Sequence, residues 1–388
     1  MIEMVDNQAQ CLLLDYRNCS VVDFAKPYCE SRVPEMLSRH IPLSLFYQCM
    51  IRKLLARFRC TDLDDYLKTR AMQNQSDHLG GLFADAGIGT VLIDDSSSST
   101  SEPHSSLLPL SLLPSAPLLA ASQLAQLTNL NIKRVLAIEP VLERLFVDND
   151  TFDQALRNLE RAFDNAIDES LQGNLKVVAL KTSLANGGLA LEASTVASAR
   201  TAYHPARKEV IDNGRLGRTA SYNYLLAQVL ELAVKRGLPL QIRASADQQA
   251  MLVDNNPLAF QPILRAQRFA DLKVVFLHSY PFVRETAYLA SVYPGVFFDL
   301  SLANSQLAPD LTRLYYEALS AAPYSKLLAG TGGNSQPESF WYGATCLRRG
   351  LSEALKELTE KGYLLKAQME EVERAVLRSN AINLYNLH

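Results

Sequence analysis

The chain has 388 residues, with 38 lysines and arginines against 41 aspartates and glutamates and a formal net charge of −3. Hydrophobic residues make up 48% of it and charged residues 20%, which excludes a wholly disordered chain because so much apolar surface favours a packed core. No excess of positive charge is present to bind phosphates, so we expect no nucleic-acid partner.

The six cysteines form no Cys-x-x-Cys pair and no zinc-finger spacing, which favours reduced thiols in a cytoplasmic protein. The N-terminus has neither the basic start nor the apolar stretch of a secretory signal. The most apolar region, 105–124, contains Pro109, Pro114 and Pro117, which argue against a spanning helix. We therefore predict no membrane segment.

In chain order, a short apolar run at Cys11–Leu14 predicts the first strand. Residues 31–85 carry helical patterns throughout and predict a helical insertion after that strand. A second apolar run, Thr90–Ile93, is followed by residues 95–122, which are rich in serine, leucine and proline. We interpret 95–122 as a long loop inside one domain that spans 1–388.

Further continuous apolar runs then alternate with helical patterns. Continuous runs are typical of strands buried on both faces. Eight such strands separated by helices predict an α/β fold, a (β/α)8 TIM-type barrel. An open doubly wound sheet is the alternative, but no Gly-x-Gly-x-x-Gly follows the first strand. The later runs are Arg134–Ile138, Lys176–Leu180, Pro239–Ile242, Lys273–Leu277, Val296–Phe298 and Lys326–Ala329.

In such a barrel the chemistry lies where the strands end on their carboxyl side. Titratable side chains follow most of the apolar runs, which predicts a polar barrel mouth. The candidate catalytic residues at these ends are Glu139, Lys181, Arg243, His278 and Asp299.

Each of these side chains has a functional and a structural interpretation. His278 is a candidate general base or metal ligand, or a hydrogen-bonded structural histidine. Lys181 could pair with Glu139 or with a substrate carboxylate, and Arg243 could hold an anionic substrate or cap the barrel. Asp299 is a candidate base or a hydrogen-bond acceptor at the end of a strand.

Four further residues are candidates for binding a substrate. Asn186 opens an Asn-Gly-Gly turn that could present backbone amides to an anion, Tyr280 follows His278, and Gln8 and Gln10 precede the first apolar run. The other histidines show no His-x-His or His-Glu-x-x-His spacing, so we predict no metal ligand among them, and no P-loop or other cofactor motif is present, so we predict no cofactor.

The segment Leu277–Glu285, with Tyr293-Pro294-Gly295-Val296 and Asp299-Leu300-Ser301, resembles the amidohydrolase-related family. The resemblance extends over most of the chain and is strongest after about residue 175. It is closest to the branch found alone or fused ahead of glutamine synthetase-like domains. It implies a distorted (β/α)8 barrel, metal-assisted hydrolysis or decarboxylation in active relatives, and is compatible with a homodimer.

The chain departs from that family at the positions that hold its metal. Gln8 and Gln10 stand where relatives have a His-x-His, Arg243 stands where they have a histidine, and 330–334 has glycine where they have an aspartate. This comparison implies Ile2–Val5 as the first strand, an alternative to Cys11–Leu14 that stays open. Only His278 of the usual ligands remains. A guanidinium about 4 Å from a divalent ion costs roughly 8 kcal/mol at an effective dielectric constant of about 20.

These departures leave three hypotheses. The favoured one is a divergent, catalytically inactive descendant kept as a binding or interaction module, with a small anionic molecule as its ligand. The alternative is a metal-independent hydrolase or lyase that acts on a lactone, amide or carboxylate through Arg243 and His278. An intact metallohydrolase would need other ligands, such as His78, Asp94 and Asp95.

Overall fold

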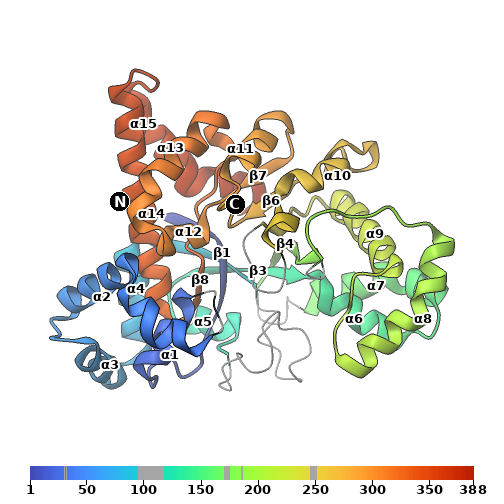
Figure 1. Cartoon of the computed structure of the whole chain (residues 1–388), viewed down its shortest axis with the longest axis horizontal. Helices are drawn as coiled ribbons and strands as arrows, with labels where there is room; N and C mark the ends of the chain where they lie inside the picture. Colours follow the sequence, from blue (N-terminus) through green and yellow to red (C-terminus); the bar gives the residue numbers. More distant parts are fainter. Residues whose placement is uncertain (30, 32, 95–117, 170–174, 185–186, 245–250) are drawn as a thin grey trace.

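The computed structural model describes all residues except 30, 32, 95–117, 170–174, 185–186 and 245–250. Its centre is a sheet of eight parallel strands in the order β7-β6-β5-β4-β3-β2-β1-β8 (Figure 1). The strands are β1 Met4–Leu12, β2 Ile88–Asp94, β3 Asn131–Ala137, β4 Val177–Thr182, β5 Leu240–Arg243, β6 Val274–Leu277, β7 Val296–Phe298 and β8 Gly333–Ser335.

The residues just before β8 join the two ends of this sheet. Leu327 forms a parallel bridge with Phe298 of β7, and the Leu328 amide donates to the Phe298 carbonyl at 2.9 Å. On the other side the Asn7 amide of β1 donates to the Ala329 carbonyl at 2.8 Å. The curled parallel sheet and its surrounding helices confirm the predicted (β/α)8 TIM-type barrel.

The first and last strands differ from the sequence-based prediction. β1 begins at Met4, seven residues before the predicted Cys11–Leu14, because its polar residues Asp6 to Gln8 are buried although they interrupt the apolar pattern. Residues 327–329 of the predicted eighth strand, Lys326–Ala329, do lie between β7 and β1, but the regular ladder to β1 forms further along the chain, at Gly333–Ser335.

The barrel interior consists of an apolar layer with a polar layer next to the mouth. Side chains of the apolar layer come from the middle of the strands, and the C-terminal helix α16 (Asn380–Tyr385) contributes to the same cluster. Since side chains alternate along a strand, the next inward positions of β2 and β4 are Asp94 and Lys181. The apolar layer includes Val5, Leu92, Val135, Ala179, Val275, Leu277 and Leu328, with Ala381, Leu384 and Tyr385 of α16.

Helices between β1 and β2 lie on one side of the barrel and those between β3 and β5 on the opposite side (Figure 1). The first group is α1 Val21–Ala25, a π-helix at Met36–His40, α2 Leu45–Phe58, α3 Leu63–Met72 and α4 Gln75–Ala86, and α5 Ala121–Leu127 precedes β3. The second group is α6 Ile138–Asp148, α7 Phe152–Glu169, α8 Val196–Asn213 and α9 Ala220–Arg236. Thr219 caps α9 by accepting from the Tyr222 amide at 3.2 Å, as an N-terminal cap should.

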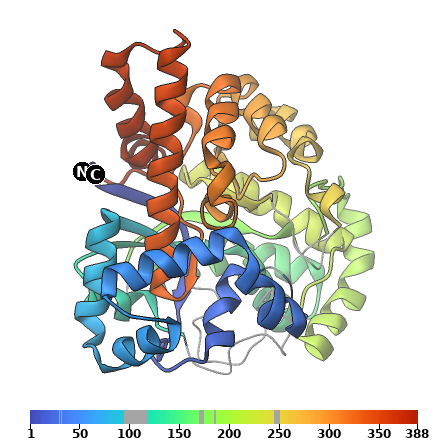
Figure 2. The same cartoon turned by 60° about the vertical axis from the view of Figure 1, so that its left-hand side comes forward.

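The remaining helices cover the last strands and bring the chain ends together. They are α10 Gln261–Arg265, α11 Val283–Val292, α12 Ser301–Gln306, α13 Leu311–Ala321, α14 Pro337–Glu360, α15 Met369–Arg374 and α16. Figure 2 shows both termini on the same side of the barrel, where Arg378 and Glu3 form an ion pair at 3.1 Å. No helix in the described part of the chain combines the length and apolar character needed to cross a bilayer.

Candidate functional site

Asp299, at the end of β7, is the centre of a buried hydrogen-bond network. Its Oδ1 accepts from the His278 amide at 2.8 Å, from the Ser301 amide at 3.1 Å and from the Ser301 hydroxyl at 2.6 Å. Its Oδ2 accepts from the Asn7 side-chain amide at 2.8 Å. Burial raises the pKa of Asp299, while these donors oppose that rise.

The imidazole of His278 is held through the same network. Its Nδ1 lies 2.5 Å from the Ser301 hydroxyl oxygen, and that hydroxyl gives its one proton to Asp299. Nδ1 therefore carries a proton and donates it to Ser301, which leaves the lone pair of the neutral ring on Nε2. Burial, followed by the charges of Arg243 and Lys181, holds the His278 pKa well below its usual value, so the ring is neutral near pH 7.

The three strands that carry these cations and the imidazole are neighbours in the sheet. Lys181 is the next-to-last residue of β4, Arg243 is the last residue of β5, and His278 is the first residue after β6. Adjacent strands lie about 4.8 Å apart, so three chemically different strand ends adjoin one another. This adjacency agrees with the lowering of the His278 pKa by the positive charges of Arg243 and Lys181.

Lys181 and Glu139 are both bound, but not to each other. The Lys181 ammonium pairs with Asp94 at 2.9 Å, and their side chains are only 9% and 12% exposed. Glu139, in the first turn of α6, accepts from the hydroxyls of Thr182 at 2.6 Å and Tyr222 at 2.9 Å. The suggested Lys181–Glu139 pair is therefore not what the structure has, because an aspartate at the end of β2 is opposite the ammonium instead.

A second set of contacts crosses the barrel interior below the mouth. The side-chain amide of Gln241 on β5 donates to the Asn7 carbonyl at 3.1 Å and to the Tyr385 hydroxyl at 3.0 Å. The Tyr385 hydroxyl in turn donates to the Asn7 side-chain oxygen. Strands β1 and β5, which are not neighbours, are thus linked through a tyrosine of the C-terminal helix.

Asp6 forms a third polar contact at the seam of the barrel, where β1 meets the segment that precedes β8. It is fully buried, and one of its oxygens accepts from the Thr331 amide at 2.8 Å while the other accepts from the Thr331 hydroxyl. Burial is the largest effect on this carboxyl, and it raises the pKa of Asp6 to about 7. The seam therefore holds a carboxyl that titrates near neutrality.

The four residues predicted to bind a substrate lie in different environments. Gln8 is buried and its side-chain oxygen has no hydrogen-bond partner among the described residues, whereas Gln10 is exposed. Tyr280, on the turn after His278, is 40% exposed. Asn186 lies outside the residues that the structure describes.

The donor atoms do not fit the metal centre that the resemblance implies. The Asp299 oxygens are taken up by four hydrogen bonds, His278 Nδ1 by Ser301, and two cations act on the imidazole. A Cβ built on Gly330 would lie 3.0 Å from Asp299 Oδ2, so an aspartate there would collide with the network. Within the described ranges, no group of three or more His, Cys, Asp or Glu side chains could hold a metal ion.

The alternative ligand set also does not assemble. His78 lies in the helical insertion, with its two ring nitrogens 3.0 and 3.3 Å from the hydroxyls of Tyr16 and Tyr66. Asp94 pairs with Lys181, and Asp95 falls outside the described residues. Burial lowers the pKa of His78, and the ring belongs to a separate buried cluster.

That cluster joins the helical insertion to the barrel. Arg70 of α3 is fully buried, and its Nη1 donates to Glu338 of α14 at 2.9 Å and to Gln336 at 2.7 Å. The guanidinium lies 5.3–5.9 Å from the ring centres of Tyr16, Phe24 and Tyr66. Burial is the largest effect on Glu338 and raises its pKa, but the charges of Arg70 and His78 and the hydrogen bonds from Tyr66 and Arg70 together outweigh it, so the pKa is lowered.

Three residues central to the network were not assigned a role from the sequence. Asn7, Ser301 and Tyr385 are neutral, and each meets its partner only through the fold. The alternation of side chains along β1 is a usable signal, because Asn7 is two residues beyond the inward-facing Val5. For Tyr385 no such periodic signal exists.

The chain was compared with family models, curated proteins and solved structures, and no family model matches it. It is 29% identical over 174 residues to protein fluG of Emericella nidulans, a match that covers 43% of this chain and 20% of that protein. The match thus spans a fifth of that relative. A partial match to a longer protein agrees with a family branch in which this barrel is fused to further domains.

Three solved structures share the fold over nearly the whole chain. A protein of Lactobacillus casei, provisionally described as a metal-dependent hydrolase, has a TM-score of 0.83 and 23% identity, covering 100% of this chain and 96% of its own. Uronate isomerase of Thermotoga maritima has a TM-score of 0.62 and 12% identity, with coverage of 99% and 94%. Glucuronate isomerase of Caulobacter crescentus has a TM-score of 0.61 and 11% identity, covering 100% of this chain and 91% of its own.

At these identities the likeness concerns the fold. The chain has the (β/α)8 barrel fold of these neighbours, of which one is described as a metal-dependent hydrolase and the others as a uronate and a glucuronate isomerase. The barrel fold that the resemblance implied is thereby confirmed. The network around Asp299 and His278 is the feature of this chain from which a function must be argued.

Proposed function

We propose that this chain is a divergent amidohydrolase-like barrel that does not act as a metallohydrolase and instead binds a small anionic molecule at the barrel mouth. The observation that carries the proposal is the adjacency of Lys181, Arg243 and His278 at three neighbouring strand ends. Two cations beside a neutral imidazole favour a carboxylate over a metal ion.

The three side chains would divide the binding between them. Arg243 would offer a planar fork that matches a carboxylate, and Lys181 would add positive charge while it remains paired with Asp94. His278, neutral and held by Ser301, would accept a hydrogen bond at Nε2 from a hydroxyl or acid group of the ligand. Asp299 and Asn7 would keep the imidazole and β1 in register.

Calorimetric titration with benzoate and glutarate tests this binding. Arg243→Gln should weaken the bound carboxylate at least about tenfold, as loss of one charge-assisted contact predicts. Arg265→Gln, an exposed arginine on α10, is the matched control and should bind as the parent protein does. Equal affinity in both variants would remove Arg243 from the site.

Elemental analysis of protein purified from zinc- and manganese-supplemented cultures tests the other half of the proposal. We expect far less than one metal ion per chain, because the hydrogen bonds of Asp299 would have to break before it could ligate. One zinc or manganese per chain, lost from His278→Ala, would overturn the proposal.

A metal-independent hydrolase or lyase is the second candidate, and the hydrogen-bonded series Asp299–Ser301–His278 favours it. A carboxylate that fixes the tautomer of a neutral histidine prepares Nε2 to take a proton. A panel of lactones and carboxylated amides should be turned over faster by the native protein than by His278→Ala. Equal background rates for the two proteins would count against catalysis by His278.

A further inference from the structure

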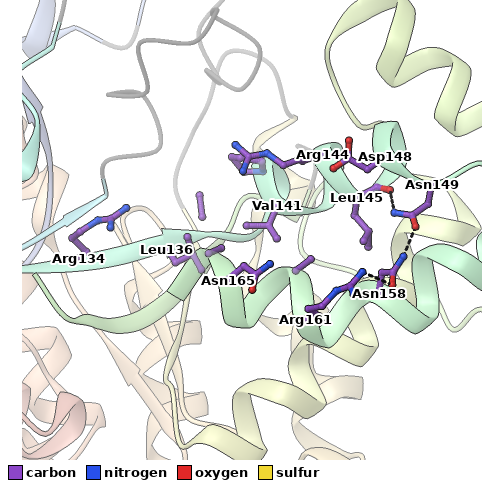
Figure 3. Close-up of a pocket in the computed structure, with 14 residues that line it drawn as sticks. Arg134, Leu136, Val141, Arg144, Leu145, Asp148, Asn149, Asn158, Arg161 and Asn165 are labelled. Carbon is purple, nitrogen blue, oxygen red and sulfur yellow. Dashed lines mark hydrogen bonds between the residues drawn. The ribbon is translucent and has the colours of Figure 1, made fainter. Parts of the chain in front are cut away.

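A cavity separate from the barrel mouth lies where β3 meets α6 and α7 (Figure 3). Its volume is about 410 Å³, within the range of small-molecule sites. Apolar side chains from all three elements form part of its wall, among them Leu136, Val141 and Ala162. None of the five candidate catalytic residues lines it, so it is not part of the site described above.

Positive charge predominates around this cavity. Arg134, Arg144 and Arg161 line it, against one carboxylate, that of Asp148. Asp148 is one helical turn beyond Arg144 on α6, yet the two form no ion pair. Figure 3 shows these arginines on different sides of the cavity, from β3, α6 and α7 respectively.

Two of these arginines differ from most others in the described part of the chain. Neither Arg144 nor Arg161 has a carboxylate oxygen within 4.0 Å among the described residues. Elsewhere Arg57, Arg200 and Arg236 each bind a carboxylate at 2.5–2.8 Å. Uncompensated cations that face one concave, partly apolar surface raise the local concentration of anions.

A series of hydrogen bonds fixes one of the two guanidinium groups. The buried Asn149 side chain donates to the Leu145 carbonyl at 2.8 Å, and Asn158 donates to the Asn149 oxygen at 2.6 Å. Arg161 Nη2 donates to the Asn158 oxygen at 3.0 Å, as the dashed lines in Figure 3 show. The guanidinium is therefore oriented before a ligand arrives, which lowers the entropy cost of binding.

We propose that this cavity binds a small organic anion, a carboxylate or phosphate group attached to an apolar body. The anionic group would bind Arg144 and the oriented guanidinium of Arg161, and the apolar body would pack against Val141 and its neighbours. The proposal is independent of the anion-binding role proposed for the barrel mouth.

Calorimetry with phenyl phosphate and benzoate, at fixed ionic strength, tests the proposal and separates the two anionic groups. The Arg144→Gln/Arg161→Gln double variant should bind the preferred probe at least about tenfold more weakly. Arg52→Gln/Arg265→Gln, which removes the same charge from two exposed positions elsewhere, is the matched control and should bind normally. Arg243→Gln should also leave this binding unchanged, which distinguishes the cavity from the mouth.

Val141→Phe provides a second, independent readout, because it fills the apolar wall and keeps both arginines. It should abolish binding of phenyl phosphate and benzoate but retain a weak interaction with inorganic phosphate. Equal binding by the native protein and the arginine double variant would overturn the proposal. So would the absence of any binding by both organic probes, or a phenyl probe bound no better than inorganic phosphate.

Discussion

Asn7 and Asp299, which are 292 residues apart in the chain, are joined by a 2.8 Å hydrogen bond inside the barrel. The bond joins β1 to the residue that follows β7. These two strands lie on either side of residues 327–329, which close the sheet. The Asn7 side-chain oxygen also accepts a hydrogen bond from the Tyr385 hydroxyl, so both the NH2 group and the oxygen of this side chain are hydrogen-bonded. A neutral amide at this position lets a buried carboxylate ionise beside it.

Replacing Asn7 by aspartate should therefore destabilise the protein in a pH-dependent manner. Two carboxyl groups within hydrogen-bond distance cannot both ionise without a large penalty. The Asn7→Asp variant should lose more unfolding free energy at pH 8 than at pH 5, because protonation at the lower pH restores a donor. Urea unfolding at both pH values measures this, and Asn7→Ala, which adds no carboxyl group, should lose about 1–3 kcal/mol with a smaller difference between the two pH values.

Loss of the Ser301 hydroxyl should release the His278 tautomer. In the native protein we expect ¹⁵N spectra to show a neutral ring with its proton on Nδ1. Ser301→Ala should shift the proton partly to Nε2 and cost about 1–2 kcal/mol in stability. Ser301→Thr keeps the hydroxyl, and a native spectrum in that variant would separate the hydrogen bond from packing. An Nε2-protonated ring in the native protein would contradict the assignment.

Asp6 should make stability fall as pH rises toward neutrality. The native carboxyl keeps its proton up to a pKa of about 7, whereas the unfolded carboxyl loses it near 3.8. Between these values the native state binds more protons, so the unfolding free energy decreases by up to about 1.4 kcal/mol per pH unit from this group. The contribution is fully present below 3.8 and is lost above about 7. The free energy of unfolding, measured by urea titration at several pH values from 4 to 8, should depend less on pH for Asp6→Asn than for the native protein.

Breaking the Arg70–Glu338 pair should be among the most costly single substitutions. Both side chains are fully buried, so Arg70→Met leaves an unpaired carboxylate and should cost about 3–5 kcal/mol. The double variant Arg70→Met/Glu338→Leu should recover part of this loss, because no buried charge remains. Arg39→Met, an exposed arginine paired with Glu35, should change stability by about 0.5 kcal/mol or less. Chemical unfolding of all three variants is the measurement.

Gly330→Ala should lower the melting temperature and disturb the mouth together. A methyl group there would lie 2.9 Å from the Ser301 Cβ and 3.0 Å from Asp299 Oδ2, both of which are buried. We expect a loss of about 1–3 kcal/mol, as overpacking of a dense interior produces. Calorimetric melting, with the His278 ¹⁵N signal as a local probe, checks both effects. An unchanged melting temperature would contradict the close packing at Gly330.

The sequence-based prediction was most accurate for strands whose runs are apolar throughout. Runs such as Lys176–Leu180 and Lys273–Leu277 correspond to β4 and β6 because both faces of those strands are covered. β8, Gly333–Ser335, is short and polar, so composition could not distinguish it from a loop. The predicted position of β1 was too late in the chain, because the buried polar residues of this strand break the apolar pattern by which a strand is recognised.

The same reasoning explains what could be predicted of the candidate site. Lys181, Arg243, His278 and Asp299 follow apolar runs, so the barrel rule identifies them as neighbours before any contact is known. The partners that fix their states are less visible in the sequence. Ser301 and Tyr385 are common core-compatible residues, and only the closed barrel brings them to His278 and Asn7.

The C-terminal helix α16 has a consequence for how the molecule assembles. Tyr385 lies 378 positions from Asn7, and its hydroxyl adds a second link between β1 and β5 beside their direct Gln241–Asn7 contact. The polar contacts of the barrel interior are therefore complete only when α16 has packed against β1 and β5. Contacts between parts of the chain this far apart in sequence raise the contact order, and a high contact order predicts slow folding.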